Sequence, residues 1–287
     1  MNIDKNKKEI IAVVTGSSSG IGLETSLLLA RNGFHTFATM RNLDKSNALL
    51  DLKQKEQLPL EVLHLDVTDD KSVKEAIGKI INEHQRIDIL VNNAGYALVG
   101  PLEETSIEEI KEQFETNVFG VIRVIQQVLP IMRKQGTGSI VNVSSIAGQI
   151  GFPLTSGYVS SKFALEGLSE SLAYETEQFG IKVVIIEPGI IKTNFDNNLK
   201  TAKKVTDNTY YNSPYAEITQ KRLSGFKPRF ENGTPSIEVA KVILGAIRSE
   251  NPKLRHIVGD DAFKIMEIRK NTSDREFREV VTNGVLK

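Results

Sequence analysis

Short apolar runs alternate along this chain with longer stretches in which apolar residues recur every three or four positions. The apolar runs are rich in valine, isoleucine and leucine, and they cover residues 10–15, 35–40, 60–66, 87–91, 139–143 and 181–186. Nearly continuous apolar runs of this length are typical of strands that are covered on both faces. Because strand and helix patterns alternate at least five times, the chain is predicted to be an α/β protein with a doubly wound, mostly parallel sheet.

Two long helices are expected, over 106–134 and over 157–178. Ser106 and Glu109 have the spacing of a capping box, in which each side chain accepts a hydrogen bond from the backbone of the other residue. In the helix expected over 106–134, the valines are predicted to lie around the whole helix rather than along one stripe. Such an apolar surface is typical of helices that pair with another subunit, so a homo-oligomer, either a dimer or a tetramer, is expected.

The last third of the chain has a different composition. Residues 194–234 are polar and irregular, with scattered aromatic side chains, as expected of a substrate-binding lid with short helices of its own. Thr234 and Pro235 have the pattern of a helix cap and a first helical residue. A final strand is expected over 255–258.

One domain accounts for these elements. We expect a single α/β domain over 8–260, including the lid at 194–234, and a helical extension over 261–287.

Composition and charge narrow the classes of partner. The 287 residues include 36 basic and 36 acidic side chains, so no long-range field would attract nucleic acid or an anionic membrane. The chain has no cysteine, which excludes thiolate metal sites and disulfides and fits a reducing compartment. No segment has the roughly 20 apolar residues of a membrane span, and the first nine residues lack the apolar core of a signal peptide. We therefore expect a cytoplasmic protein with a small-molecule partner. Its four histidines are isolated in sequence, and no metal is expected.

A glycine-rich turn follows the first predicted strand. Gly16, Gly20 and Gly22 lie between that strand and a helical pattern. Such a turn allows positive φ angles, lets a pyrophosphate approach the backbone, and presents the N–H groups of a helix start to phosphates. The spacing is GxxxGxG and not GxGxxG, so a turn that serves only sheet packing is the alternative.

The end of the second predicted strand bears on the choice of cofactor. In dinucleotide sites an acidic residue about 20 positions after the glycines binds the adenosine ribose, whereas an arginine there accommodates a 2′-phosphate. This chain has Arg41 at that distance and no acidic residue before Asp44. NADP is therefore favoured over NAD, with an ordinary solvated arginine as the alternative interpretation.

Tyr158 and Lys162 are four residues apart on a predicted helix and so share one face. A tyrosine near pKa 10 is a poor acid–base catalyst at neutral pH, and a neighbouring ammonium group would lower that pKa. Ser144 and Ser145 end the fifth predicted strand, at the edge of the sheet where such folds bind ligands. Alone, a tyrosine and a lysine at this spacing are more often a surface pattern.

Taken together and in this order, these motifs resemble those of the short-chain dehydrogenase/reductase family, over about residues 8–194. The resemblance implies a Rossmann fold and an NAD(P)-dependent oxidoreductase that acts on an alcohol or ketone carbon of an apolar small molecule. It assigns Asn117, Ser145, Tyr158 and Lys162 as catalytic residues. The cofactor-binding residues that we expect are Gly16, Ser18, Ser19, Gly20, Ile21, Gly22, Arg41, Asp66, Val67, Asn93, Ala94, Gly95, Tyr158, Lys162, Pro188, Gly189, Ile191 and Thr193.

The resemblance also implies a role for each catalytic residue. Ser145 would polarise the substrate carbonyl, Tyr158 would donate the proton, and Lys162 would hold the nicotinamide ribose. Asn117 would keep a water in place behind the lysine, and Ser144 would be structural. The alternative from another class is a non-catalytic NADP-binding regulator or scaffold with the same fold.

Overall fold

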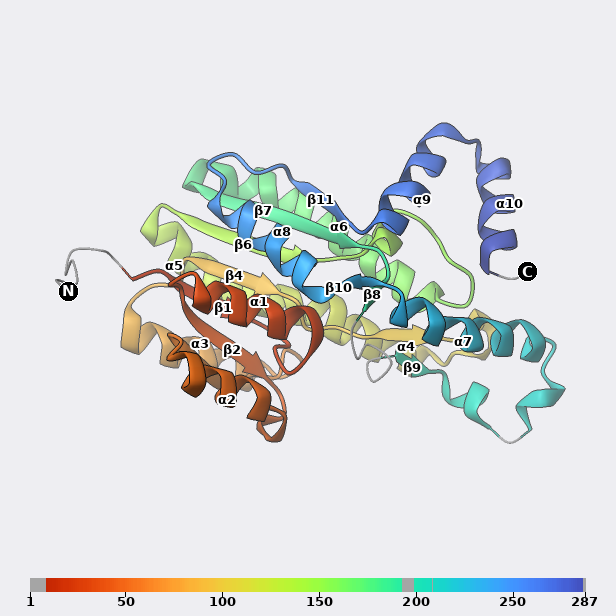
Figure 1. Ribbon diagram of the computed structural model, residues 1–287, viewed down its shortest axis with the longest axis horizontal. Helices are drawn as coiled ribbons and strands as arrows, with labels where there is room; N and C mark the ends of the chain where they lie inside the picture. Colours follow the sequence, from red (N-terminus) through yellow and green to blue (C-terminus); the bar gives the residue numbers. More distant parts are fainter. Residues whose placement is uncertain (1–8, 193–198, 208, 286–287) are drawn as a thin grey trace.

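A seven-stranded parallel sheet forms the centre of the molecule in the computed structural model, which describes residues 9–192, 199–207 and 209–285 (Figure 1). Its strand order is β11-β7-β6-β4-β1-β2-β3. The strands are β1 (Ile11–Val14), β2 (His35–Met40), β3 (Leu60–His64), β4 (Ile89–Asn92), β6 (Gly138–Val143), β7 (Ile181–Pro188) and β11 (Arg255–Val258). Each predicted apolar run is therefore a strand of this sheet, with ends that differ from the prediction by at most two residues. The doubly wound architecture is confirmed.

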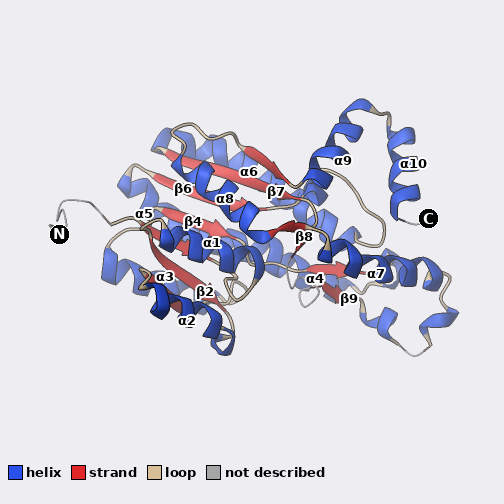
Figure 2. Ribbon diagram, viewed as in Figure 1, coloured by secondary structure: helices blue, strands red, loops and turns tan. Residues whose placement is uncertain are grey.

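Helices cover both faces of the sheet (Figures 1 and 2). The longer helices are α1 (Gly20–Arg31), α2 (Asn47–Glu56), α3 (Asp70–His84), α4 (Ile107–Phe114), α5 (Gly120–Gln135), α6 (Ser156–Thr176), α7 (Ala216–Glu231), α8 (Ser236–Arg248), α9 (Asp260–Asn271) and α10 (Asp274–Val285). Helices α1, α2 and α8 lie on one face, and α3, α5 and α6 lie on the other. None of the helices in the described ranges is both long and apolar enough to cross a membrane.

Alternate residues of each strand supply the two cores. Ile11 and Val13 pack with α3 and α5, whereas Ala12 and Val14 pack with α1 and α8. All four side chains are fully buried. Burial on both faces explains why the sequence of such a strand is continuously apolar and not alternating.

The predicted helix over 106–134 is interrupted. It begins with the expected capping box of Ser106 and Glu109, but a π-helical turn, η3 (Glu115–Phe119), separates α4 from α5. The prediction that its valines surround the helix was wrong, because Val121, Val124 and Val128 form one buried stripe against the sheet. Insertions of this kind often occur at functional sites.

The segment that follows β7 is more regular than predicted. It contains two short strands, β8 (Ile191–Lys192) and β9 (Leu199–Thr201), and the 16-residue helix α7. Strand β9 pairs with β5 (Ala97–Val99). Residues 194–198 and 208 of the expected lid lie outside the described residues.

Thr234 does not cap a helix, contrary to the prediction. Thr234–Pro235 forms β10, which pairs with β8, and the Thr234 N–H donates to the carbonyl of Ile190. Helix α8 therefore begins at Ser236, with Pro235 at the N-cap position. The local sequence resembles a cap, but pairing with a strand over 40 residues away determines the backbone there.

Candidate active site

A cavity of about 560 Å³ opens at the carboxyl ends of β1, β2, β4, β6 and β7. All of the predicted site residues that the structure describes line it except Gly22 and Asn117. Thr193 lies outside the described residues. The topology thus brings together motifs that are up to 175 positions apart, because parallel strands end at the same edge of the sheet.

The glycine turn is held in a conformation that leaves its backbone open to the cavity. Gly16 has a φ of +71°, and a Cβ there would lie 2.8 Å from the Cα of Ala94. A Cβ on Gly22 would lie 2.3 Å from the carbonyl oxygen of Gly16, which explains why Gly22 supports the turn without lining the cavity. Asn93 fixes the turn from the side, since its Nδ2 donates to the carbonyls of Thr15 and Gly16 at 2.9 and 3.1 Å.

The first turn of α1 points at this cavity. Its N-cap residue, Ser19, has an extended backbone and makes no side-chain capping hydrogen bond. The N–H groups of a helix start that lacks such a cap are available to an anion, and the helix dipole favours one. An open glycine turn and an uncapped helix start fit the pyrophosphate of a dinucleotide.

Basic side chains lie at the end of β2. Arg41 and Lys45 both line the cavity and are exposed, and neither side chain makes a hydrogen bond or an ion pair with another described residue. Between them, the Asn42 side chain accepts a hydrogen bond from the Asp44 N–H at 2.9 Å. Lys45 was not among the predicted site residues, because a lysine in a polar loop has no distinguishing pattern.

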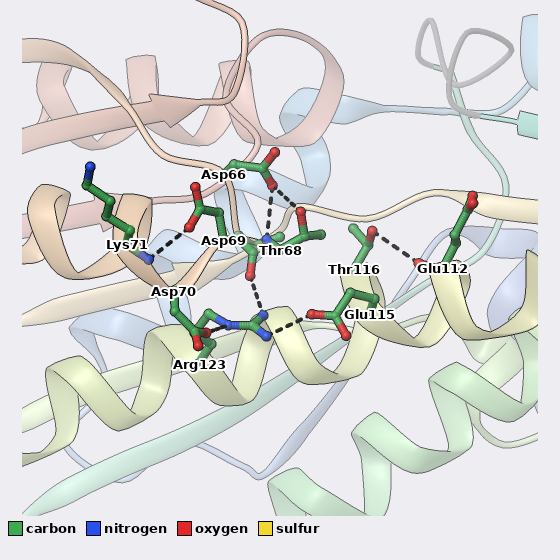
Figure 3. Close-up of polar contacts among 10 residues, drawn as sticks. Asp66, Thr68, Asp69, Asp70, Lys71, Glu112, Glu115, Thr116 and Arg123 are labelled. Atoms are coloured by element: carbon green, nitrogen blue, oxygen red, sulfur yellow. Dashed lines mark hydrogen bonds and ion pairs between the residues drawn. The ribbon is translucent and has the colours of Figure 1, made fainter. Parts of the chain in front are cut away.

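Asp66 follows β3 and has one oxygen already engaged (Figure 3). Its Oδ1 accepts from the N–H and the hydroxyl of Thr68, at 2.9 and 2.8 Å. Arg123 on α5 donates to the carbonyl of Val67 and pairs with Asp70 and Glu115, which ties this loop to the helix (Figure 3). The loop that carries Asp66 and Val67 is therefore a rigid wall of the cavity.

Ser145, Tyr158 and Lys162 meet at the opposite side. The Ser145 Oγ accepts from the Ala147 N–H at 3.1 Å and donates to the Pro188 carbonyl at 3.4 Å. A side-chain hydrogen bond also joins Ser145 to Tyr158. The Lys162 Nζ donates to the carbonyl of Val143 at 2.9 Å and lies 5.8 Å from the centre of the Tyr158 ring.

The pKa of Tyr158 is not shifted in the predicted direction. The pKa of Tyr158 is raised and not lowered, because burial disfavours the phenolate more than the hydrogen bond with Ser145 favours it. Burial also lowers the pKa of Lys162 to about 8, against a smaller opposite effect of Glu166. Spacing on a helix predicts that two groups are neighbours, but the pKa depends on how deeply both are buried.

Asn117 lies one layer behind the cavity, in the π-helical turn. Its side chain is 1% exposed. Its Nδ2 donates to the carbonyl of Tyr96 at 3.0 Å and to Ser161 Oγ at 3.2 Å, and its Oδ1 accepts from the Tyr96 N–H at 3.2 Å. The residue therefore connects the loop after β4 with α6, the helix that carries Tyr158 and Lys162.

Residues from the end of β11 and the start of α9 hold the loop after β7 in place. The carboxylate of Asp261 accepts from the Ile190 N–H at 2.8 Å, and the Gly189 N–H donates to the Val258 carbonyl at 2.9 Å. These bonds hold Pro188, Gly189 and Ile191 against the cavity. No pattern in the sequence marks Asp261, which was predicted to begin a C-terminal extension.

His35 and His84, which are isolated in sequence, are neighbours in the structure. Their ring centres lie 4.6 Å apart, and both rings share the carboxylate of Glu9 through contacts of 2.9 and 3.2 Å. His35 begins β2, so the cluster lies at the opposite edge of the sheet from the cavity.

Two carboxyl groups are buried together behind Lys162. Glu166 is one helical turn after the lysine, and Glu187 precedes Pro188; they are 5% and 1% exposed. Arg255 contacts both carboxylates, at 3.0 Å and 3.6 Å, and Gln149 donates to Glu187. Burial, followed by the charge of Glu166, raises the pKa of Glu187 to about 7.

The raised pKa of Glu187 predicts that stability depends on pH. The folded protein keeps the Glu187 proton up to about pH 7, whereas the unfolded chain releases it near pH 4.5. The contribution of this group to the free energy of unfolding is therefore fully present below pH 4.5 and should be lost as the pH rises through 7, by up to about 3 kcal/mol for the whole shift. Glu187→Gln should therefore unfold at nearly the same denaturant concentration at pH 5.5 and pH 8, whereas the wild type should be less stable at pH 8. Chemical denaturation at the two pH values measures this difference.

Glu170→Gln is the matched control, because Glu170 pairs with the same arginine from the surface. It should leave the loss of stability between pH 5.5 and 8 in place. An equal loss in the wild type and in Glu187→Gln would contradict the prediction.

Comparison with known proteins agrees with this geometry. The family model of the short chain dehydrogenases matches residues 10–204. An uncharacterized oxidoreductase of Bacillus subtilis, YusZ, is 43% identical over 259 residues, which are 88% of this chain and 90% of that protein. A short-chain dehydrogenase from Streptomyces avermitilis has a crystal structure that superposes with a TM-score of 0.82 at 32% identity, over 96% of each chain.

A further solved structure, ElxO with NADP bound, has a TM-score of 0.70 and 31% identity, and it covers 87% of this chain and 96% of its own. The matched region contains the glycine turn, the serine at the end of β6 and the pair on α6. This chain therefore belongs to the short-chain dehydrogenase/reductase family of nicotinamide-dependent oxidoreductases.

Proposed function

We propose that this protein is an NADP-dependent oxidoreductase that interconverts an alcohol and a carbonyl group on an apolar small molecule, with Tyr158 as general acid and base. The observation that carries the proposal is the meeting of Ser145, Tyr158 and Lys162 in the cavity that also contains the glycine turn. When bound, the nicotinamide ring supplies or accepts the hydride.

The chain's own residues would handle the proton. The phenol of Tyr158, whose pKa is raised by desolvation, keeps its proton at neutral pH, which is the state that can donate to a carbonyl oxygen. The Ser145 hydroxyl, next to it, would polarise the same oxygen. Lys162, whose pKa of about 8 is close to neutral, is suited to hold ribose hydroxyls and to resupply the proton.

Asn117 would act as a positioning residue. Through Tyr96 and Ser161 it holds α6 against the loop after β4. We place Gly16, Ser18, Ser19, Gly20, Ile21 and Gly22 at the pyrophosphate. Asp66 and Val67 would contact the adenine, with the second carboxylate oxygen of Asp66 facing outward (Figure 3). Asn93, Ala94, Gly95, Pro188, Gly189 and Ile191 would line the rest of the cofactor site.

NADP is proposed because of charge at the end of β2. Arg41 and Lys45 line the cavity, neither forms an ion pair in the part of the chain that the structure describes, and no acidic residue stands between the end of β2 and Asp44. A 2′-phosphate would find two cations there and no repulsion. The solved relative ElxO, at 31% identity, holds NADP, which supports the same choice.

A substrate screen tests the proposal. Purified protein should oxidise NADPH, measured as loss of absorbance, in the presence of some members of a panel of medium-chain ketones and aldehydes. NADPH binding without turnover of any panel member would favour the alternative, a cofactor-binding regulator.

A homo-oligomer remains a prediction, on a different basis. Phe119, which ends η3, is 50% exposed, and Phe163 on the neighbouring α6 is 45% exposed. Two such side chains on adjacent elements are typical of a covered interface. Light scattering should give a dimer or a tetramer, and Phe119→Asp with Phe163→Asp should shift the mass towards the monomer. A wild-type monomer at micromolar concentration would contradict this prediction.

A further inference from the structure

Arg222, on α7, is a buried cation with no ion-pair partner among the described residues. Its side chain is 8% exposed and lines the cavity. It makes no hydrogen bond or ion pair with any residue in the described parts of the chain, and its Nε has no acceptor. Burial lowers its pKa only to about 10, so it remains charged at neutral pH. A buried, unpaired charge destabilises the fold unless something compensates it, and a ligand anion would do so.

A cation–π contact holds the guanidinium group of Arg222 in place. Its carbon lies 4.4 Å from the centre of the Phe226 ring. Such a contact needs no hydrogen-bond acceptor, so the N–H donors of the group remain available to the oxygens of an anion. Arg222, Phe226 and Arg229 are spaced at i, i+4 and i+7, so they share the face of α7 that lines the cavity.

Arg229 adds a second positive charge near Arg222. Arg229 lines the same wall and donates to the backbone carbonyl of Gly284 on α10. Its charge contributes to the lowered pKa of Arg222, so the two groups repel each other. By contrast Lys200, also at the cavity, already has Glu112 at 3.8 Å.

The remaining wall near these cations is mainly apolar. Ile265 from α9 and Val280 and Val281 from α10 line the cavity together with Phe226, and the carboxylate of Asp261 on α9, which also lines it, already accepts from the Ile190 N–H. The end of the cavity formed by α7, α9 and α10 therefore combines apolar side chains with a pair of cations, of which one is buried. This combination matches a molecule with an apolar body and one compact negative charge.

We propose that this end of the cavity recognises a carboxylate, and that the substrate is an amphipathic acid whose carboxylate binds Arg222 while its alcohol or carbonyl carbon lies at Tyr158. The inference rests on the proposed function, and it adds the chemical class of the substrate. Arg229, at the edge of the site, would add a second positive charge near the same carboxylate.

The cofactor's phosphates are the other source of negative charge. The glycine turn and the start of α1 lie at the end of β1, and Arg41 and Lys45 lie at the end of β2. Helix α7 instead packs against β8, beyond the loop after β7. Arg222 thus belongs to elements on the substrate side, and the test includes an arm for each source.

Calorimetric titration of the protein in the presence of NADPH tests this proposal with decanoate and decanamide, which have nearly the same shape and differ in charge. Decanoate should bind about ten- to a hundredfold more tightly, as expected for a charge-assisted pair. Arg222→Met should abolish this ratio, and Arg222→Lys should restore part of it. Arg278→Met, an exposed change of the same charge on α10, should leave it unchanged.

Equal affinities for decanoate and decanamide in the wild type would overturn the proposal, and they can be measured even if Arg222→Met fails to fold. A loss of NADPH affinity in Arg222→Met that equals the loss for decanoate would also overturn it, because the arginine would then serve the cofactor. Assays of the reduction of 9-oxodecanoate and 9-oxodecanamide test the proposed reaction separately from the proposed carboxylate site. If neither is reduced while decanoate binding depends on Arg222, the proposed reaction fails and the carboxylate site stands.

Discussion

Tyr158→Phe should lower turnover by about 10²–10⁴, the usual contribution of a positioned general acid. The change removes one hydroxyl and keeps the half-buried ring that lines the cavity, so the fold should be preserved. The affinity for NADPH should stay within a few-fold of the wild type, because the phenol acts on the substrate oxygen. Steady-state kinetics on a substrate from the screen, together with titration of NADPH, measures both effects.

Tyr174→Phe is the matched control. It makes the same chemical change on the same helix, at a side chain that is 70% exposed, and it should leave turnover unchanged. Lys162→Met should differ from both, because it should weaken cofactor binding as well as turnover. Full activity of Tyr158→Phe would overturn the proposed mechanism.

Arg41→Ala should reduce the preference for NADPH over NADH by about ten- to a hundredfold, the effect of one charge-assisted bond to a partly exposed phosphate. NADH binding should barely change, because NADH lacks the phosphate. Lys45, which lines the same part of the cavity, should keep part of the preference. Dissociation constants for the two cofactors measure this ratio.

Asn42→Asp tests the same site by adding repulsion. An aspartate can accept the hydrogen bond from the Asp44 N–H that Asn42 accepts now, so the local turn should persist. NADPH should bind more weakly and NADH should be affected less. Met40 is unsuitable for such a change, because its side chain is 2% exposed and a carboxylate there would be buried. Equal weakening of both cofactors by Arg41→Ala would show that Arg41 does not bind the 2′-phosphate.

The sequence by itself determined the fold class and most of the cavity's lining. Buried parallel strands must be apolar on both faces, so 10–15 and 181–186 are recognisable without any knowledge of their neighbours. Glycines between a strand and a helix, and a tyrosine four residues before a lysine, are local patterns with local causes. Since all parallel strands end at one edge of the sheet, the motifs after β1, β6 and β7 had to lie close together.

Only the tertiary structure decided the features that depend on long-range contacts. Pairing with β8 placed Thr234 in a strand, although its local sequence is that of a helix cap. Burial raised the pKa of Tyr158. How far this side chain is removed from water depends on how α6 packs, and not on the spacing of Tyr158 and Lys162 along the helix. Arg222 is an ordinary arginine in a polar stretch of sequence; it has no ion-pair partner within the described ranges because α7 turns it inward, towards a mainly apolar wall from α9 and α10. Sequence patterns report the local backbone and which side chains face a core, whereas the charge and partners of a side chain depend on what the fold brings beside it.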